Sequence, residues 1–127
     1  MQKKIRILVV DDHTIMLEAL SQMLGKEPDF EIVGVAADGG EAVNLAEEIK
    51  PDIILMDIGM PIMDGIEATR IISKEFPSIK IIGLSMYKED ECGNEIRAAG
   101  AVGYVCKTEK KNKLLATIRD SLQAPAE

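Results

Sequence analysis

Short apolar runs alternate along the chain with longer segments whose apolar positions recur every three or four residues. The clearest runs cover residues 5–10 and 53–56, and each is followed directly by aspartate. Brief runs rich in Ile, Val and Leu are typical of strands buried on both faces of a parallel sheet. We therefore predict five strands, the second of them weakened by Gly34, at residues 5–10, 30–37, 52–57, 79–84 and 103–106.

The segments between these runs have the apolar spacing of helices with one buried face. Helices are predicted at residues 14–26, 41–50, 65–76, 89–99 and 109–122. Pro51 and Pro77 end two of them, and Gly100 suits the left-handed position after the fourth. The residues predicted to be buried are Met16, Leu17, Leu20, Met23 and Leu24 in the first helix, Ala42, Leu45, Ala46 and Ile49 in the second, Cys92, Ile96 and Ala99 in the fourth, and Leu115, Ile118 and Leu122 in the last.

The regular alternation of strands and helices predicts the α/β fold class. Short connections between them indicate parallel strands joined by right-handed crossovers, as in an open, doubly wound sheet. Such sheets bind their ligands beyond the carboxyl ends of the strands. Polar residues at the strand ends are therefore the first candidates for function.

Composition narrows the classes of function. The chain has 127 residues, 46% hydrophobic and 29% charged, which suits one folded domain with a sizeable core. A net charge of −7 argues against binding of nucleic acid or an anionic membrane by this chain. No apolar run approaches the roughly 20 residues of a membrane span, and the first strand starts too early for a signal peptide. We expect a cytoplasmic domain over residues 1–122, with 123–127 as a tail or the start of a linker.

Three residues with metal-binding or redox-active side chains do not by themselves indicate a metal or redox site. Cys92 and Cys106 lack metal-ligand spacing, and we interpret them as two free thiols. His13 is interpreted as an ordinary first-turn or surface residue, because no cysteine or second histidine accompanies it.

Polar side chains gather where the predicted strands end. They are Asp11 and Asp12 after the first strand, Asp57 at the end of the third, Ser85 after the fourth and Lys107 after the fifth. Mg²⁺ prefers oxygen ligands, typically one or two carboxylates with phosphate oxygens and water. A lysine and a hydroxyl beside such a cation can neutralise and bind phosphoryl oxygens, which is most of what phosphoryl transfer requires. The set therefore predicts a magnesium-dependent phosphoryl site.

Asp57 is the favoured nucleophile of this site, because it stands alone at its strand end whereas Asp11 and Asp12 form a metal-holding pair. Each residue also has a simpler interpretation. Asp12 could cap the following helix, and Ser85 and Lys107 could be ordinary loop residues. The coincidence of four strand ends favours the functional interpretation.

These residues resemble the receiver domain of bacterial two-component response regulators over essentially the whole chain. The most specific stretch is residues 55–65, LMDIGMPIMDG, which is similar to the phosphoacceptor loop of that family. Residues 31–34 and 65–70 further resemble receivers of the LuxR-type subfamily, which usually carry a C-terminal helix-turn-helix domain. The positions that match the family pattern are Asp11, Asp12, Ser85, Tyr104 and Lys107.

The resemblance implies a flavodoxin-like sheet of five parallel strands in the order 2-1-3-4-5 with five helices. It implies that Asp57 accepts a phosphoryl group from a sensor histidine kinase or from a small donor such as acetyl phosphate. Lys107 and Ser85 would contact that group, and Tyr104 would rotate as a switch residue. Mg²⁺ would be held by Asp12, Asp57 and the backbone carbonyl of Gly59, with Asp11 acting through water.

The same resemblance implies a regulatory role rather than an enzyme. The surface of the last two helices and the last strand would change shape to control an output. The partners that the resemblance implies are a second copy of the phosphorylated chain and a DNA-binding domain that regulates transcription. Thr108 stands where many relatives have a cis proline, and a trans bond is expected there. Gly59 and Tyr87 occupy positions that influence phosphoryl lifetime in the family.

Three other functions remain as alternatives. A Mg²⁺-dependent phosphohydrolase with an aspartyl-phosphate intermediate would usually have a second carboxylate at the position of Gly59. A flavodoxin-like cofactor binder would need a neutral phosphate loop after the first strand, where Asp11-Asp12-His13 would repel phosphate. A receiver that acts constitutively as a protein-binding module would not need the complete acidic and lysine set.

Overall fold

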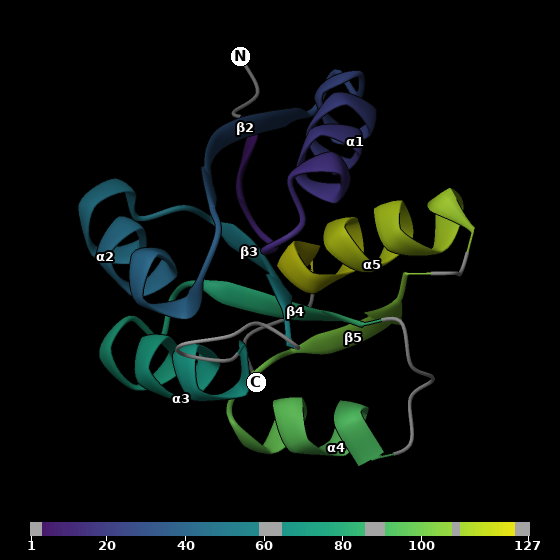
Figure 1. The fold of residues 1–127 in the computed structure, drawn as a ribbon. Helices are drawn as coiled ribbons and strands as arrows, with labels where there is room; N and C mark the ends of the chain where they lie inside the picture. Colours follow the sequence, from purple (N-terminus) through teal and green to yellow (C-terminus); the bar gives the residue numbers. More distant parts are fainter. Residues whose placement is uncertain (1–3, 59–64, 86–90, 108–109, 124–127) are drawn as a thin grey trace.

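The computed structural model describes residues 4–58, 65–85, 91–107 and 110–123, and Figure 1 shows their arrangement. Strands and helices alternate throughout, as the sequence predicts. The strands are β1 (Ile5–Val10), β2 (Phe30–Ala36), β3 (Ile53–Asp57), β4 (Lys80–Ser85) and β5 (Gly103–Cys106). The helices are α1 (Thr14–Gly25), α2 (Gly39–Ile49), α3 (Gly65–Glu75), α4 (Glu91–Ala98) and α5 (Lys111–Gln123).

The strands form one parallel sheet in the order β2-β1-β3-β4-β5. The predicted fold class and strand order are thereby confirmed. In register, Val10 lies opposite Met56, Asp57 opposite Leu84, and Ser85 opposite Cys106. The carboxyl ends of β1, β3, β4 and β5 therefore lie along one edge of the sheet, and this edge is where the polar residues follow the strands.

Helices cover both faces of the sheet. Figure 1 shows α1 and α5 on one face and α2, α3 and α4 on the other. Alternate residues of β1 serve the two faces: Ile7 and Val9 pack with Leu20, Leu24 and Ile118, whereas Leu8 and Val10 pack with Ala42, Ala46 and Ile72. Strands covered on both sides must be apolar at nearly every position, and β3 is buried along its whole length.

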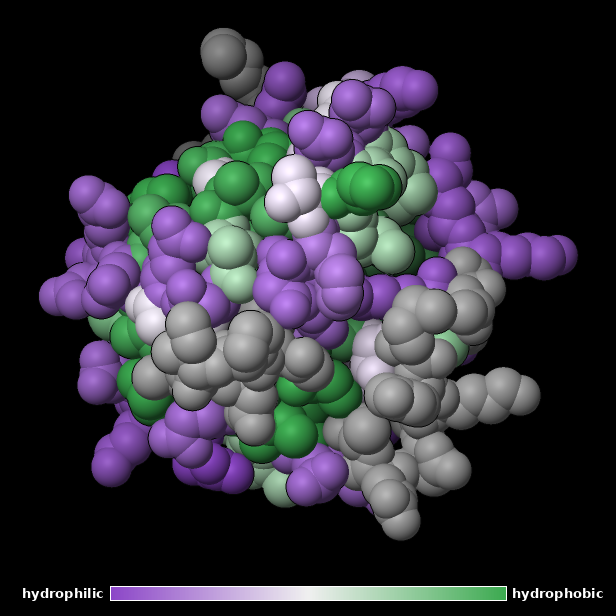
Figure 2. Space-filling model, viewed as in Figure 1, coloured by the Kyte–Doolittle hydropathy of each residue, from purple (hydrophilic) through white to green (hydrophobic). Residues whose placement is uncertain are grey.

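On the face shown in Figure 2, hydrophilic residues lie around and between apolar patches. Among the described residues, the most exposed large apolar side chain is that of Ile15 in α1, at 82%. No helix in the described ranges is long and apolar enough to cross a membrane.

Strand β2 runs through Gly34 with an irregular register, and the weakening predicted there stays a prediction. The register with β1 shifts between Ile7 and Leu8, whose partners are Ile32 and Gly34. A Cβ at Gly34 would lie only 3.1 Å from Ile49 Cδ1, so α2 packs closely onto the strand at this point. The bare backbone of glycine therefore allows the approach of helix to sheet.

Helix α2 begins at Gly39, two residues before the predicted start. Asp38 is its N-cap, with a side chain that accepts a hydrogen bond from the backbone N–H of Glu41 at 2.8 Å. The Glu41 carboxylate in turn accepts from the N–H of Ala37 at 2.8 Å. The first bond satisfies a donor that the first turn of a helix cannot satisfy itself, and the second ties the residue before the N-cap to that turn.

The burial predicted for α5 is partly wrong. Leu115 and Ile118 are buried, but Leu122 is 37% exposed and Leu114 is buried instead. The apolar period gives the direction of a side chain around the helix axis, whereas burial also requires a neighbour at that height along the axis. Leu122 lies in the last turn of α5, one residue before the helix ends.

Arg119 ties α5 to the segment between α1 and β2. Its guanidinium donates to both carboxylate oxygens of Asp29 and to Glu27, each at 2.9 Å, and lies 4.9 Å from the ring centre of Phe30. The hydrogen bonds from Arg119 hold the pKa of the Asp29 carboxyl below its usual value. This charged contact fixes one end of α5 to the rest of the domain.

At the end of α4, Gly100 has a φ of +123°, which confirms the predicted need for glycine. Helix α5 begins at Lys111, after the non-helical residue 110, and so starts later than the predicted residue 109. The predicted start of α4 at residue 89 and the segment 124–127 lie outside the described residues. Cys106 is a buried thiol, whereas the side chain of Cys92 is not among those described.

Candidate functional site

The polar residues predicted at the strand ends meet at one edge of the sheet. Asp11 and Asp12 follow β1, Asp57 and Ser85 are the last residues of β3 and β4, and Lys107 follows β5 directly. The groups at this edge that could hold a metal ion are Asp11, Asp12, His13 and Asp57, with ligand atoms all within 4.8 Å of one another. The parallel strands therefore assemble the predicted cluster.

Asp11 is fully buried and is held by two donors. Lys107 Nζ donates to its Oδ2 at 2.5 Å, and the backbone N–H of His13 donates to its Oδ1 at 2.9 Å. Burial raises the pKa of the Asp11 carboxyl, but the hydrogen bonds from Lys107 and His13 outweigh burial and leave that pKa below its usual value. Asp11 is thus maintained as a carboxylate within the protein.

Lys107 lies between two buried carboxylates. Its Nζ is 3.4 Å from Asp57 Oδ1 as well as in contact with Asp11, and only 6% of the lysine side chain and 7% of the Asp57 side chain are exposed. The backbone N–H of Lys107 donates to the carbonyl of Ser85 at 2.6 Å, which joins the ends of β4 and β5. One ammonium group therefore contacts the carboxylates at the ends of both β1 and β3.

Asp12 does not cap α1, so the capping interpretation is wrong. The N-cap residue is His13, which has extended backbone angles and makes no side-chain capping bond. The Asp12 side chain is 25% exposed, yet its Oδ1 is buried and makes no hydrogen bond within the described part of the chain. A buried carboxylate oxygen without a donor is costly, and a cation would satisfy it. The donor set and this oxygen fit a divalent metal.

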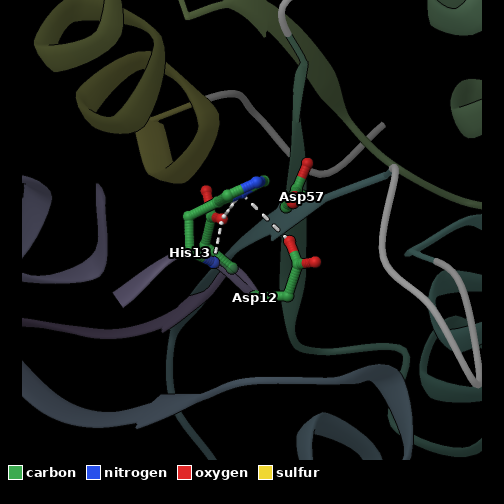
Figure 3. A group of neighbouring side chains, drawn as sticks. Asp12, His13 and Asp57 are labelled. Atoms are coloured by element: carbon green, nitrogen blue, oxygen red, sulfur yellow. Dashed lines mark hydrogen bonds and ion pairs between the residues drawn. The ribbon is translucent and has the colours of Figure 1, made fainter. Parts of the chain in front are cut away.

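Sequence reasoning missed the place of His13. The residue is at the surface, as predicted, with 72% of its side chain exposed. Its ring nevertheless turns toward the acidic cluster, and Nδ1 lies 3.1 Å from both Asp11 Oδ1 and Asp12 Oδ1. Figure 3 shows His13, Asp12 and Asp57 coming together where β1 and β3 end. The only signal in the sequence was the position of the histidine directly after the acidic pair.

Ser85 and Tyr104 are both buried, each 4% exposed. Tyr104 belongs to the core on the side of α2, α3 and α4, together with Ile81 and Ile96. Its role as a switch stays a prediction. The predictions for Gly59, Tyr87 and Thr108 fall outside the described residues.

Comparison with known proteins decides the family. A family model, that of the response regulator receiver domain, matches residues 7–119 of the chain. The chain belongs to this family. The match covers β1 to α5 and includes all the residues of the acidic cluster.

Two curated relatives of the receiver domain are transcriptional regulatory proteins. The regulatory protein LiaR of Bacillus subtilis is 44% identical over 115 residues, which is 91% of this chain and 54% of LiaR. The regulatory protein DegU of Brevibacillus brevis is 36% identical over 125 residues, which is 98% of this chain and 53% of DegU. The receiver domain thus spans about half the length of these relatives.

Solved structures of receivers have the same fold. A LuxR-family two-component response regulator from Aurantimonas sp. SI85-9A1 superposes with a TM-score of 0.91 at 36% identity, covering 95% of this chain and 86% of that one. The response regulator domain of Thermotoga maritima CheB gives a TM-score of 0.89 at 35% identity, covering 98% and 100%. The chain is a two-component receiver of the LuxR type, and its relatives are regulatory proteins, which supports signal transduction over the phosphohydrolase alternative.

Proposed function

We propose that this receiver domain is switched by phosphorylation of Asp57. The observation that carries the proposal is the placement of the Asp57 carboxylate, nearly buried at the end of β3 and 3.4 Å from Lys107 Nζ, among the other carboxylates of the cluster. A carboxylate that attacks phosphorus forms an acyl phosphate, and the reaction depends mainly on positioning and on neutralising charge. Lys107 supplies a positive charge at that point.

The contacts of the three aspartates support different roles. Asp11 has no exposed surface, and each of its oxygens already accepts a hydrogen bond. Asp12 keeps one buried oxygen without a donor in the described residues, which suits a metal ligand better than a nucleophile. Asp57 lies on the central strand β3, between β1 and β4, and therefore faces the groups from both sides. We assign the phosphoryl group to Asp57.

The cation of the site is proposed to be Mg²⁺. Asp12, Asp57 and the backbone carbonyl of Gly59 would hold it directly, with Asp11 acting through water. When bound, Mg²⁺ neutralises charge on phosphoryl oxygens and orients them. The contribution of the chain is to hold its carboxylates close together, which Lys107 does by pairing with Asp11 and Asp57.

Ser85 and Tyr104 are proposed to carry the signal away from Asp57. Ser85 ends the strand next to Asp57 and would donate its hydroxyl hydrogen to the phosphoryl group. The neighbouring backbone is already coupled, because the N–H of Ile58 donates to the carbonyl of Leu84 at 3.2 Å. A shift of the β4 end would open space for Tyr104, and the surface of α4, β5 and α5 would change shape.

The partners follow from this chemistry. The phosphoryl donor would be a sensor histidine kinase in the cytoplasm or a small molecule such as acetyl phosphate. Phosphorylation would favour a homodimer, and the output would be transcription through a DNA-binding domain of the longer protein. The domain would act as a regulator, with at most self-catalysed gain and loss of its phosphoryl group.

Intact-mass analysis after incubation with acetyl phosphate and Mg²⁺ tests the proposal. The wild-type domain should gain one labile phosphoryl group, and Asp57→Asn should gain none. Asp120→Asn removes an exposed carboxylate of α5 and should leave the adduct unchanged. Failure of the wild-type domain to form an adduct with any donor would refute the phosphorylation mechanism.

A further inference from the structure

An imidazole nitrogen lies beside the carboxylates of the acidic cluster. His13 Nδ1 is 3.1 Å from Asp12 Oδ1, although most of the imidazole is exposed to solvent. The ring is not engaged as a helix cap, since no side-chain capping bond is made at this residue. His13 is also the only histidine of the chain. Any property that depends on an imidazole can therefore be assigned to this position.

The contacts around His13 leave one carboxylate oxygen that a cation would satisfy. Asp11 is served by Lys107 and by the backbone N–H of His13, and its Oδ1 also lies within hydrogen-bond distance of the ring nitrogen. Asp12 Oδ1 makes no hydrogen bond within the described ranges, despite its distance from the ring. If Nδ1 carries a hydrogen and donates it to Asp11, the Asp12 oxygen receives no hydrogen bond. A metal ion between Nδ1 and Asp12 Oδ1 would use a lone pair from each.

The spacing of these two atoms agrees with shared coordination. Two ligands at adjacent positions of an octahedral ion, each about 2.1 Å from the metal, lie about 3.0 Å apart. The observed separation of His13 Nδ1 from Asp12 Oδ1 is 3.1 Å. Asp57 lies within reach of the same point, because all the ligand atoms of the cluster are within 4.8 Å of one another. Figure 3 shows the three side chains converging on it.

We propose that His13 is a metal ligand through Nδ1, and that it makes the site bind a divalent transition-metal cation more tightly than Mg²⁺. The inference rests on the metal site of the proposed function. Imidazole nitrogen is a good ligand for Co²⁺, Ni²⁺ and Zn²⁺, whereas Mg²⁺ prefers oxygen. A neutral imidazole with its hydrogen on Nε2 presents the Nδ1 lone pair to the cluster. The exposed part of the ring can keep that hydrogen in contact with water.

Calorimetric titration of the tag-free protein with Co²⁺ and with Mg²⁺ tests the proposal. The matched variant is His13→Gln, which keeps a polar side chain and removes no helix cap. The wild-type domain should bind Co²⁺ more tightly than Mg²⁺. The substitution should weaken Co²⁺ binding by about tenfold or more and change Mg²⁺ binding less than about twofold. Cobalt should also shift the carbon-bound imidazole proton resonances of His13 far out of the diamagnetic range.

Equal Co²⁺ affinity in the wild-type domain and His13→Gln would overturn the proposal. An equal loss for both metals would also overturn it, since His13 would then act only by arranging the carboxylates. Asp12→Asn should lose both metals. If the wild-type domain bound neither metal, the metal site of the proposed function would itself fail. The Mg²⁺-dependent phosphoryl adduct of the wild-type domain separates these cases, because its formation supports the proposed function whatever the Co²⁺ titrations give.

Discussion

Removal of the Asp12 charge should raise the stability of the metal-free domain. The carboxylates of Asp11, Asp12 and Asp57 have ligand oxygens within 4.8 Å of one another, and Lys107 pairs with only two of the three. Two unit charges at that separation repel by about 0.9 kcal/mol in bulk water and by about 3.5 kcal/mol at an effective dielectric constant of 20. Partial exposure of Asp12 and the charge of Lys107 reduce the effect. We expect Asp12→Asn to gain about 1 kcal/mol, or roughly 3–5 °C in melting temperature.

The same substitution should remove the stabilisation by magnesium. A ligand at 100 times its dissociation constant stabilises the folded state by about 2.7 kcal/mol. Urea denaturation followed by circular dichroism, with EDTA or with saturating MgCl₂, measures both effects. Asp12→Asn should be more stable than the wild-type domain in EDTA and should not respond to MgCl₂.

Glu48→Gln provides the matched control, because it removes one negative charge from an exposed position of α2. Its free energy of unfolding should stay within about 0.5 kcal/mol of the wild-type value under both conditions. A loss of stability for Asp12→Asn in EDTA would refute the repulsion argument. A full response of Asp12→Asn to MgCl₂ would show that Asp12 is not a metal ligand.

Two further predictions concern the scaffold. Arg119→Gln should lower the urea midpoint near neutral pH, and the difference from wild type should shrink as pH falls. Arg119 keeps the folded-state pKa of Asp29 below the ordinary value of about 3.9, so the stabilisation is complete above that value and is lost through the folded-state pKa. Urea midpoints of both proteins, measured from neutral pH down through the folded-state pKa of Asp29, check this direction. A difference between the two midpoints that stayed constant with pH would contradict it. Gly100→Ala should cost about 2 kcal/mol, because φ is +123° and the new Cβ would overlap Ser73 Oγ. An unchanged melting temperature would contradict that strain.

The sequence was sufficient to predict the fold and to predict that the acidic residues lie together at one edge of the sheet. Strands buried on both faces must be apolar at nearly every position, so their limits are visible without structure. Parallel pairing then brings Asp11, Asp57 and Lys107 to one edge, whatever the details of packing. The magnesium site and phosphoacceptor residue assigned to this edge stay predictions, as does location in the cytoplasm.

Other features depend on geometry that a periodic pattern does not contain. His13 faces the cluster because its backbone is extended at the N-cap of α1, with φ of −99° and ψ of 110°. The exposure of Leu122 depends on where the surface that covers α5 ends. Tyr104 is buried because α4 closes over β5, a contact between elements that sequence spacing does not measure. The local pattern thus predicts the helices, the strands and the edge of the sheet where polar residues gather. Tertiary contacts decide which way individual side chains point and how deeply they are buried.

The most direct test of the central claim locates the phosphoryl group within the chain. Acetyl phosphate and Mg²⁺ would be followed by borohydride, which reduces an aspartyl phosphate to homoserine, and by peptide mapping. We predict conversion at Asp57 and retention of aspartate at Asp11 and Asp12. Homoserine at either of those residues, or its absence from a domain that carries the phosphoryl mass, would contradict the assignment of Asp57 as the acceptor.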